Sequence, residues 1–165
     1  MPGWDVGDEW PEMQTSGEVL VVDDDPSIRT LLSFVFHDEG FEVVEAADGR
    51  EALEALRTSP PALMILDLMM PNVDGIAVLR ERKENALALG TRVLVLTAKN
   101  DTQDMVWCWE LGADEYLTKP VDPDRLLREG LALMASSPEE LRGRRERGLA
   151  EARRLDAIEA AFRPR

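Results

Sequence analysis

The sequence is poor in cysteine and has no long hydrophobic run. Cys108 is the single cysteine among 165 residues, which excludes an intramolecular disulfide framework and favours a reducing compartment. No apolar stretch approaches the roughly 20 residues needed to cross a bilayer, and the N-terminus lacks a basic region followed by an apolar one. We therefore expect a soluble, cytoplasmic protein without membrane contact.

Basic residues are also scarce. The chain has 19 Lys and Arg against 33 Asp and Glu, which gives a formal net charge of −14. A sequence-independent grip on nucleic acid needs clustered cations that displace counterions from phosphates. The charge balance therefore predicts no direct nucleic acid binding, to DNA or to RNA.

What the sequence does contain is a short apolar run that ends in a carboxylate. Residues 62–66 read Ala-Leu-Met-Ile-Leu and are followed by Asp67, with two prolines before the run and a Pro-Asn-Val-Asp-Gly turn after it. The length and boundaries of the run predict a strand buried on both faces. Asp67 then stands at the carboxyl end of a strand, where open parallel sheets place their sites.

A second buried strand, at residues 18–23, also closes with acidic residues. Asp23, Asp24 and Asp25 follow one another there. Asp25 precedes Pro26, and an acidic N-cap before a proline is a sufficient explanation for it. Asp23 and Asp24 have no such structural role, which makes them candidates for a site.

The remaining chain alternates between predicted strands and helices. Further strands are predicted at residues 41–46, 92–96 and 114–118, and helices at about 26–39, 49–59, 76–89, 101–111 and 123–135. Short connections between alternating elements require a parallel sheet with right-handed crossovers. We therefore predict an α/β doubly wound five-stranded parallel sheet, and we interpret the charged run at 80–84 as the solvated face of a helix.

The polar residues at the strand ends converge on one edge of this sheet. Asp23, Asp24 and Asp67 would repel one another in a cleft, and protonation or a bound cation must relieve the repulsion. Hard oxygen ligands favour Mg²⁺. Lys119 adds a positive charge and Thr97 a hydroxyl donor, so the set suits phosphoryl transfer with Asp67 as the nucleophile of an acyl phosphate.

Five signatures in the chain occur in the order typical of one family. They are Val-Val-Asp-Asp-Asp-Pro at 21–26, Leu-Asp-Leu-Met-Met-Pro-Asn-Val-Asp-Gly at 66–75, Leu-Thr-Ala at 96–98, Gly-Ala-Asp-Glu-Tyr at 112–116 and Lys-Pro at 119–120. Over residues 18–135 the chain resembles the receiver domains of two-component response regulators. The resemblance implies a flavodoxin-like sheet with the strand order 2-1-3-4-5 and a cis Lys119–Pro120 peptide.

The resemblance also implies roles for the residues at the sheet edge. Asp67 would accept a phosphoryl group from a phosphohistidine, which must come from a sensor histidine kinase or phosphotransfer protein because His37 is the only histidine here and is interpreted as a surface residue. The implied Mg²⁺ ligands are Asp23, assisting through water, Asp24, Asp67 and the backbone carbonyl of Met69. The implied phosphoryl contacts come from Leu68, Thr97, Ala98 and Lys119. Tyr116 would follow Thr97 inward as an aromatic switch, so the protein would be a phosphoacceptor switch rather than an enzyme.

The fourth helix, fifth strand and fifth helix form the usual output face of this family. Met105 and Trp109 lie at helical spacing beside Tyr116 on that face. Large exposed apolar groups there would indicate a contact surface, such as a homodimer interface. The alternative is that Trp107 and Trp109 fold onto their own domain.

The two ends of the chain differ from the predicted domain. Residues 1–17 are acidic and without periodicity, so we expect a mobile tail. Residues 136–165 carry a helix start signal at Pro138 and a narrow apolar stripe at Leu141, Ala152, Leu155, Ile158 and Phe162, weakened by two glycines. Three interpretations remain open for this helical extension: a dimerising or docking helix, the start of a linker to an output domain, or a frayed tail.

Two other classes of function remain as alternatives. A haloacid-dehalogenase-like phosphatase also uses an aspartyl nucleophile with Mg²⁺, a hydroxyl residue and a lysine, but Pro26 and the following helix do not match its first motif. A purely structural dimerisation module would show no Mg²⁺-dependent response to acyl-phosphate mimics. Turnover of a small phosphoester would favour the phosphatase, and stoichiometric labelling at Asp67 the receiver.

Overall fold

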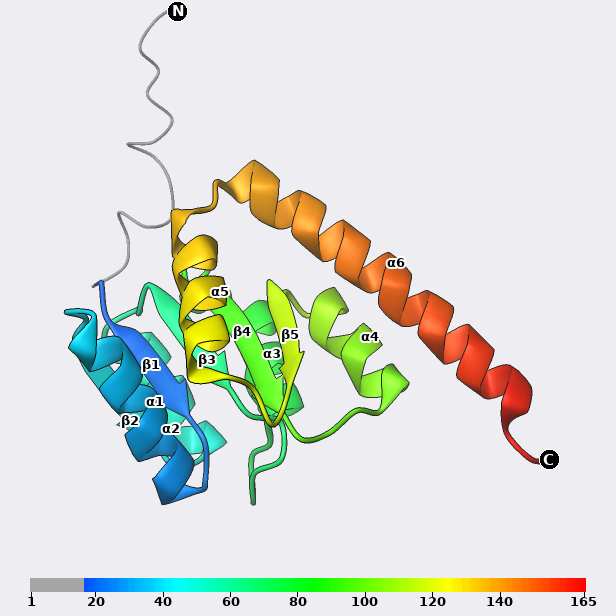
Figure 1. Cartoon of the computed structure of the whole chain (residues 1–165), viewed down its shortest axis with the longest axis horizontal. Coiled ribbons are helices and arrows are strands. Elements are labelled where there is room, and N and C mark those ends of the chain that lie inside the picture. Colours follow the sequence, from blue (N-terminus) through cyan, green and yellow to red (C-terminus); the bar gives the residue numbers. More distant parts are fainter. Residues whose placement is uncertain (1–16) are drawn as a thin grey trace, which may run out of the picture.

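The computed structural model describes residues 17–165, which form one five-stranded sheet with helices around it (Figure 1). The acidic tail predicted at 1–17 lies almost wholly outside the described residues. The strands are Val19–Val22 (β1), Val43–Ala46 (β2), Leu63–Leu66 (β3), Arg92–Thr97 (β4) and Glu115–Thr118 (β5). Their order is β2-β1-β3-β4-β5 and each neighbouring pair is parallel, so the predicted fold is confirmed.

Six helices surround the sheet in the described part of the chain. They are Pro26–Asp38 (α1), Gly49–Thr58 (α2), Gly75–Glu84 (α3), Thr102–Glu110 (α4), Pro123–Ala135 (α5) and Pro138–Phe162 (α6). Alternate strand residues face opposite sides: Leu20 and Val22 pack with α2, α3 and α4, whereas Val19 and Val21 pack with α1 and α5. Burial of both faces explains why β1 and β3 read as unbroken apolar runs. None of the helices from residue 17 onward is long and apolar enough to cross a membrane.

Acidic side chains begin five of the six described helices. Each accepts a backbone N–H of the first turn, and the capping residues are Asp25, Asp48, Asp74, Asp101 and Asp122. An acidic N-cap accepts a backbone N–H that the helix leaves unpaired, and its negative charge interacts favourably with the positive end of the helix dipole. Part of the acidic excess of this chain is therefore structural.

The segment between α3 and β4 differs from the sequence-based expectation. The helix predicted to run to about residue 89 ends at Glu84, and the following loop places Ala86 and Ala88 at positive φ angles of 51° and 47°. The Arg82 guanidinium holds this loop, since its Nη2 donates to the carbonyls of Ala88 at 3.2 Å and Thr91 at 3.0 Å. The interpretation of 80–84 as a solvated face is therefore wrong for Arg82, which is only 6% exposed.

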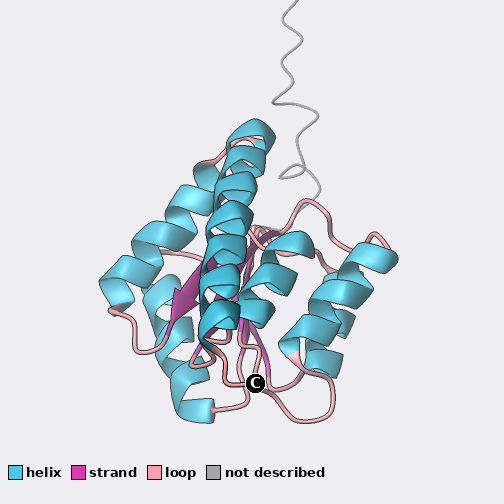
Figure 2. Cartoon of the chain, turned by 90° about the vertical axis from the view of Figure 1, so that its right-hand side faces the viewer, coloured by secondary structure: helices cyan, strands magenta, loops and turns pink. Residues whose placement is uncertain are grey.

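The C-terminal extension is a single helix that lies along α4 (Figures 1 and 2). Gly148 lies so close to Trp109 that an added Cβ would be 2.4 Å from an indole carbon. At the start of α4, the Thr102 hydroxyl donates to Asp156 Oδ1 at 2.8 Å. In this structure α6 is therefore docked on the domain of its own chain, and its interpretation as a dimerising helix or as the start of a linker stays a prediction.

Candidate functional site

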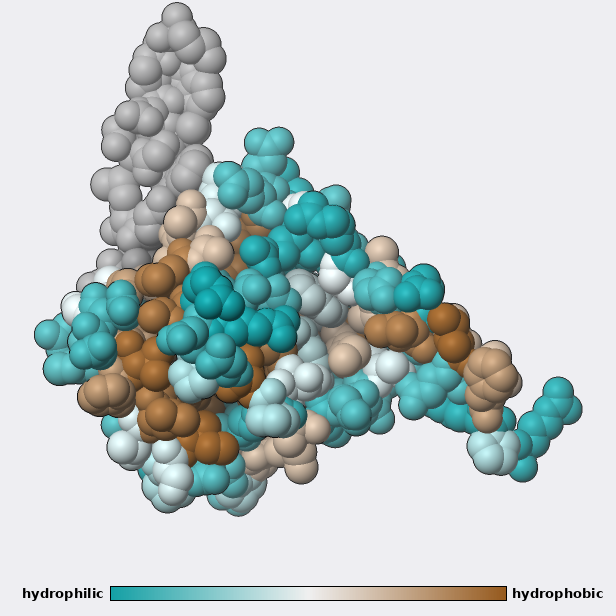
Figure 3. Space-filling view, viewed as in Figure 1, coloured by the Kyte–Doolittle hydropathy of each residue, from teal (hydrophilic) through white to brown (hydrophobic). Residues whose placement is uncertain are grey.

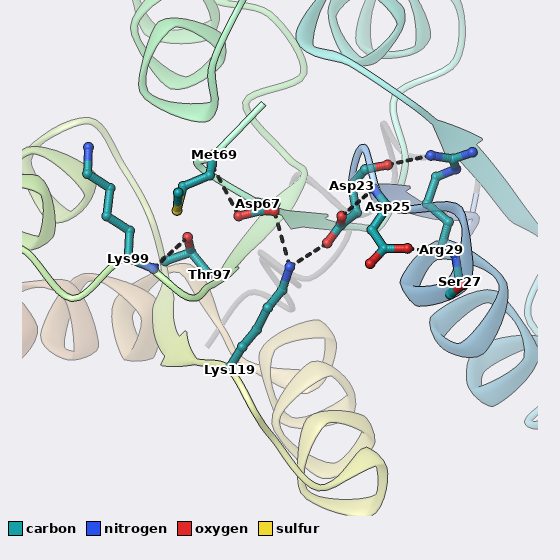
Figure 4. Close-up of polar contacts among 9 residues, drawn as sticks. All are labelled: Asp23, Asp25, Ser27, Arg29, Asp67, Met69, Thr97, Lys99 and Lys119. Atoms are coloured by element: carbon teal, nitrogen blue, oxygen red, sulfur yellow. Dashed lines mark hydrogen bonds and ion pairs between the residues drawn. The ribbon is translucent and has the colours of Figure 1, made fainter. Parts of the chain in front are cut away.

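The acidic residues after β1 have separate tasks. Asp23 is only 2% exposed, and its carboxylate accepts the backbone N–H of Asp25 at 2.9 Å. The Asp25 side chain accepts the backbone N–H of Ser27 at 2.9 Å and caps α1 (Figure 4). The prediction that Asp25 caps the helix is confirmed, whereas the site roles of Asp23 and the exposed Asp24 stay predictions.

Asp67 lies directly after β3, and the chain folds back tightly over it. An added Cβ at Gly75 would lie 2.4 Å from the Asp67 carbonyl oxygen and 2.8 Å from Leu68 Cα. Both neighbours are backbone atoms that cannot move aside, so only glycine fits this position. Asp67 is only 5% exposed, and its carboxylate accepts the Met69 backbone N–H at 3.2 Å.

Lys119 reaches this edge from the end of β5. Its Nζ lies 2.7 Å from Asp23 Oδ2 and 3.1 Å from Asp67 Oδ2 (Figure 4). The Lys119–Pro120 peptide is cis, as the family resemblance implied. Burial works to lower the pKa of Lys119, but the hydrogen bond to Asp23 and the charge of Asp67 outweigh it and raise that pKa. Burial raises the pKa of Asp23 in spite of its contact with Lys119.

The carboxylates can be tested against the requirements of a metal ion. Asp23, Asp24 and Asp67 each offer an oxygen, and these three oxygens lie within 4.8 Å of one another. Three hard oxygen donors suit Mg²⁺, and a single ammonium leaves an excess of negative charge for a divalent ion to neutralise. The residues present therefore fit a Mg²⁺ site. A contribution from the Met69 carbonyl stays a prediction.

Thr97 ends β4 and is fully buried. Its Oγ1 accepts the backbone N–H of Lys99 at 3.2 Å, which turns the chain after the strand (Figure 4). Leu68 and Ala98, predicted to contact the phosphoryl group, directly follow Asp67 and Thr97 in the chain; Leu68 is buried and Ala98 is exposed. The roles of Thr97, Leu68 and Ala98 toward a phosphoryl group stay predictions.

Tyr116 is tied to the loop that follows Thr97. Its hydroxyl donates to the Lys99 carbonyl oxygen at 2.5 Å, and the ring is half-buried. Burial raises the pKa of Tyr116, so the phenol stays protonated and can donate. On its other side, the Lys99 ammonium lies 2.5 Å from Asp104 in α4. Lys99 therefore contacts Thr97, Tyr116 and α4 at once.

The predicted output residues are divided between covered and exposed positions. Trp109 is half-buried and its indole packs against Gly148 of α6. Trp107 remains 41% exposed, and Met105 is half-buried. Of the two interpretations that the sequence left open, Trp109 packs within its own chain, against α6, and a contact role for this face stays a prediction. In the sequence the two glycines of α6 only weaken its apolar stripe. The structure gives one of them, Gly148, a role, because it allows α6 to lie close to Trp109.

Two relatives share much of this chain. The alkaline phosphatase synthesis transcriptional regulatory protein PhoP of Bacillus subtilis is 44% identical over 106 residues, which cover 64% of this chain and 43% of PhoP. The DNA-binding response regulator MtrA of Mycolicibacterium smegmatis is 41% identical over 122 residues, which cover 74% of this chain and 52% of MtrA. The chain thus spans about half the length of the curated relatives it matches.

These relatives correct the expectation that direct nucleic acid binding is excluded. One is named as a transcriptional regulator and the other as DNA-binding. A formal net charge of −14 averages over the whole chain, whereas DNA contact depends on local basic surface, which in a longer protein can belong to another region. The charge balance therefore gives no ground for excluding DNA binding.

Solved structures show the same architecture. The chemotaxis protein CheY4 of Vibrio cholerae has a TM-score of 0.66 and 32% identity, covering 71% of this chain and 98% of CheY4. The response regulator protein TrrA of Thermotoga maritima, solved in complex with Mg²⁺ and BeF, has a TM-score of 0.63 and 34% identity, covering 70% of this chain and 97% of TrrA. The model of the response regulator receiver domain matches residues 19–129, well over half of the chain. These matches favour the receiver interpretation over the phosphatase, and they show that the chain belongs to the family of response regulator receiver domains.

Proposed function

We propose that this receiver accepts a phosphoryl group on Asp67 from the phosphohistidine of a sensor histidine kinase or phosphotransfer protein, and that phosphorylation switches its protein contacts. The observation that carries the proposal is the gathering of Asp67, two further carboxylates and Lys119 at one edge of the sheet. In this proposal the chain is a phosphoacceptor that acts only on its own acyl phosphate.

The transfer needs a nucleophile, charge neutralisation and alignment. An oxygen of the Asp67 carboxylate forms the new P–O bond while the P–N bond of the phosphohistidine breaks, and the imidazole leaves with a proton. Lys119, already 3.1 Å from Asp67, stabilises the charge on the phosphoryl oxygens. Mg²⁺, when bound by the three carboxylates, supplies further positive charge to the same oxygens. In this proposal Thr97, at the end of β4, donates its hydroxyl to one of them.

A chain of contacts supports the proposed switch. Thr97 accepts from Lys99, and Lys99 in turn contacts Tyr116 through its carbonyl and Asp104 through its ammonium. Asp104 belongs to α4, the helix that carries α6. A change at Thr97 therefore has a short physical route to the α4–β5 surface, and phosphorylation would shift an existing equilibrium of that surface.

The surface beside the acidic edge suits a protein donor. α1 starts two residues after Asp24 and exposes Leu31 and Phe34, which are 50% and 66% accessible. Figure 3 shows hydrophobic surface over this part of the molecule. Because exposed apolar patches mark contact sites, we include α1 in the proposed docking surface of the phosphodonor.

The test is phosphorylation by a small donor followed by intact-mass measurement. With acetyl phosphate and Mg²⁺, the wild-type chain should gain one phosphoryl group, and it should gain none in Asp67→Asn or with a chelator present. Asp25→Asn is the matched control, because it alters a neighbouring acid while keeping a good N-cap, and it should label normally.

Three results would overturn the proposal. Failure of the wild type to label would favour a structural module, and labelling that persists in Asp67→Asn would place the acceptor elsewhere. Continuous turnover of a small phosphoester would favour the phosphatase.

A further inference from the structure

A cavity of about 380 Å³ lies at the opposite end of the sheet from Asp67. Its walls are the end of α3, the loop before β4, the end of α4 and the first turns of α6. Pro138, Leu141 and Arg145 of α6 close one side, so the cavity exists only while α6 is docked. The volume falls within the range of small-molecule sites, roughly 300–1,000 Å³.

Cationic side chains dominate this cavity. Four basic residues line it, against two acidic residues. The basic residues are Arg82, Lys83, Arg92 and Arg145, and the acidic ones are Asp114 and Glu110. Arg82 and Arg92 are only 6% and 3% exposed. Two buried arginines at one site are not what composition predicts for a chain with a formal net charge of −14.

The two acidic residues are already engaged. Asp114 accepts the Val93 backbone N–H through Oδ2 at 2.9 Å, and its Oδ1 lies 3.1 Å from Arg145 Nε. The Glu110 carboxylate pairs with Arg153 at 3.0 Å, on the α6 side of the contact. One buried carboxylate, Asp114, therefore stands between the buried guanidinium of Arg82 and the guanidinium of Arg145 at the cavity wall.

Arg82 has one buried donor without a hydrogen-bond partner. Its Nη2 serves two loop carbonyls, but its Nε is buried and has no hydrogen-bond partner. A Cβ atom added to Gly112 would lie 3.5 Å from Arg82 Nη1. An unsatisfied buried donor is costly and calls for an acceptor. Burial and the nearby charge of Arg145 lower the pKa of Arg82, whereas Asp114 raises it.

We propose that this cavity binds a small phosphate-bearing anion, held by Arg82, Lys83 and Arg145. Guanidinium groups match the geometry of phosphate oxygens, and charge-assisted hydrogen bonds supply the affinity. Trp109 also lines the cavity, so a phosphate ester with a flat ring has a surface to pack on. Because α6 provides Arg145, the bound anion would hold α6 on α4. The proposal is independent of phosphorylation at Asp67.

The experiment is thermal unfolding of the full chain, without divalent ions, in increasing inorganic phosphate or adenosine monophosphate at constant ionic strength set by chloride. Both anions should raise the unfolding temperature of the wild type with saturation, and the nucleotide should do so at lower concentration. Arg145→Gln should weaken the response about tenfold, as expected for loss of one charge-assisted contact. Lys83→Gln, which leaves the Asp114 pair intact, should also weaken it.

Two controls locate the response. Arg142→Gln removes the same charge from an exposed position of α6 and should bind like the wild type. Lys119→Ala disables the phosphoryl site and should also keep the response, because the cavity lies at the other end of the sheet. No saturable shift, equal weakening in Arg142→Gln and Arg145→Gln, or loss of the response in Lys119→Ala would each overturn the proposal.

Discussion

The two ends of this sheet have opposite electrostatic imbalances. At the carboxyl ends of β1 and β3, three carboxylates face the single ammonium of Lys119. At the amino ends of β4 and β5, several cations face the buried carboxylate of Asp114. One end is lined mainly by carboxylates and the other mainly by cationic side chains, although both belong to the same layered fold.

The difference lies in what builds each end. The acidic end is formed by strand ends and by a turn that Gly75 permits, all within the receiver fold. The basic end is completed by Arg145 of α6, which follows that fold in the chain. The first site is therefore as stable as the sheet, while the second depends on a docked helix and its exposed ion pairs, which are individually weak.

The sharpest test of this separation is a pair of variants, one at each end. Lys119→Ala should slow phosphorylation by acetyl phosphate by at least about 100-fold, because it removes a cation aimed at the transferred group. Arg145→Gln should leave the rate unchanged. The rates are followed by intact mass at fixed Mg²⁺, and an equal loss in both variants would show that the ends do not act separately.

Arg82 tests whether the basic end also has a structural task. Arg82→Met should lower the free energy of unfolding by about 2 kcal/mol, because two loop carbonyls lose their donor and cannot reach water. Arg80→Met, at an exposed position of the same helix, should change it by less than about 0.5 kcal/mol. Urea unfolding measures both, and equal effects would contradict the assigned role of Arg82.

The docking of α6 is tested by its two glycines. Gly148→Ala should destabilise the protein by about 1–2 kcal/mol, because the new methyl group overlaps the Trp109 ring. Gly143→Ala meets only the flexible end of Arg147 and should stabilise by about 0.5–1 kcal/mol through helix propensity. Thermal unfolding compares them, and a stabilising Gly148→Ala would mean that α6 does not rest on Trp109.

The acidic end was predictable because its signals are local. Asp23, Asp67 and Thr97 each end a short apolar run and Lys119 follows the last strand, and parallel strands bring such positions to one edge. Asp25 could be set aside because the following proline explains it. The unbroken apolar runs at β1 and β3 likewise predicted these strands, since burial on both faces removes the polar alternation.

The basic end was not predictable from the sequence. Its arginines come from α3, β4 and α6, and Arg82 stands in a charged run that has the composition of a solvated face. Only the left-handed loop at Ala86 and Ala88 turns the chain so that loop carbonyls meet its guanidinium. The position of α6 also depended on Gly148 fitting against Trp109, a contact that no periodicity reveals.

The smallest expected effect is the change in stability caused by Asp24→Asn, which distinguishes charge repulsion from metal binding at the acidic end. Asp24 is exposed, so Asp24→Asn should stabilise the metal-free protein by less than about 1 kcal/mol by relieving repulsion from Asp23 and Asp67. High salt should abolish this gain, since exposed charges are screened. Added Mg²⁺ should raise the unfolding temperature of the wild type more than that of Asp24→Asn, because one ligand is lost. Asp25→Asn should respond to Mg²⁺ like the wild type, so a reduced response in both variants would reflect net charge rather than a metal site that includes Asp24.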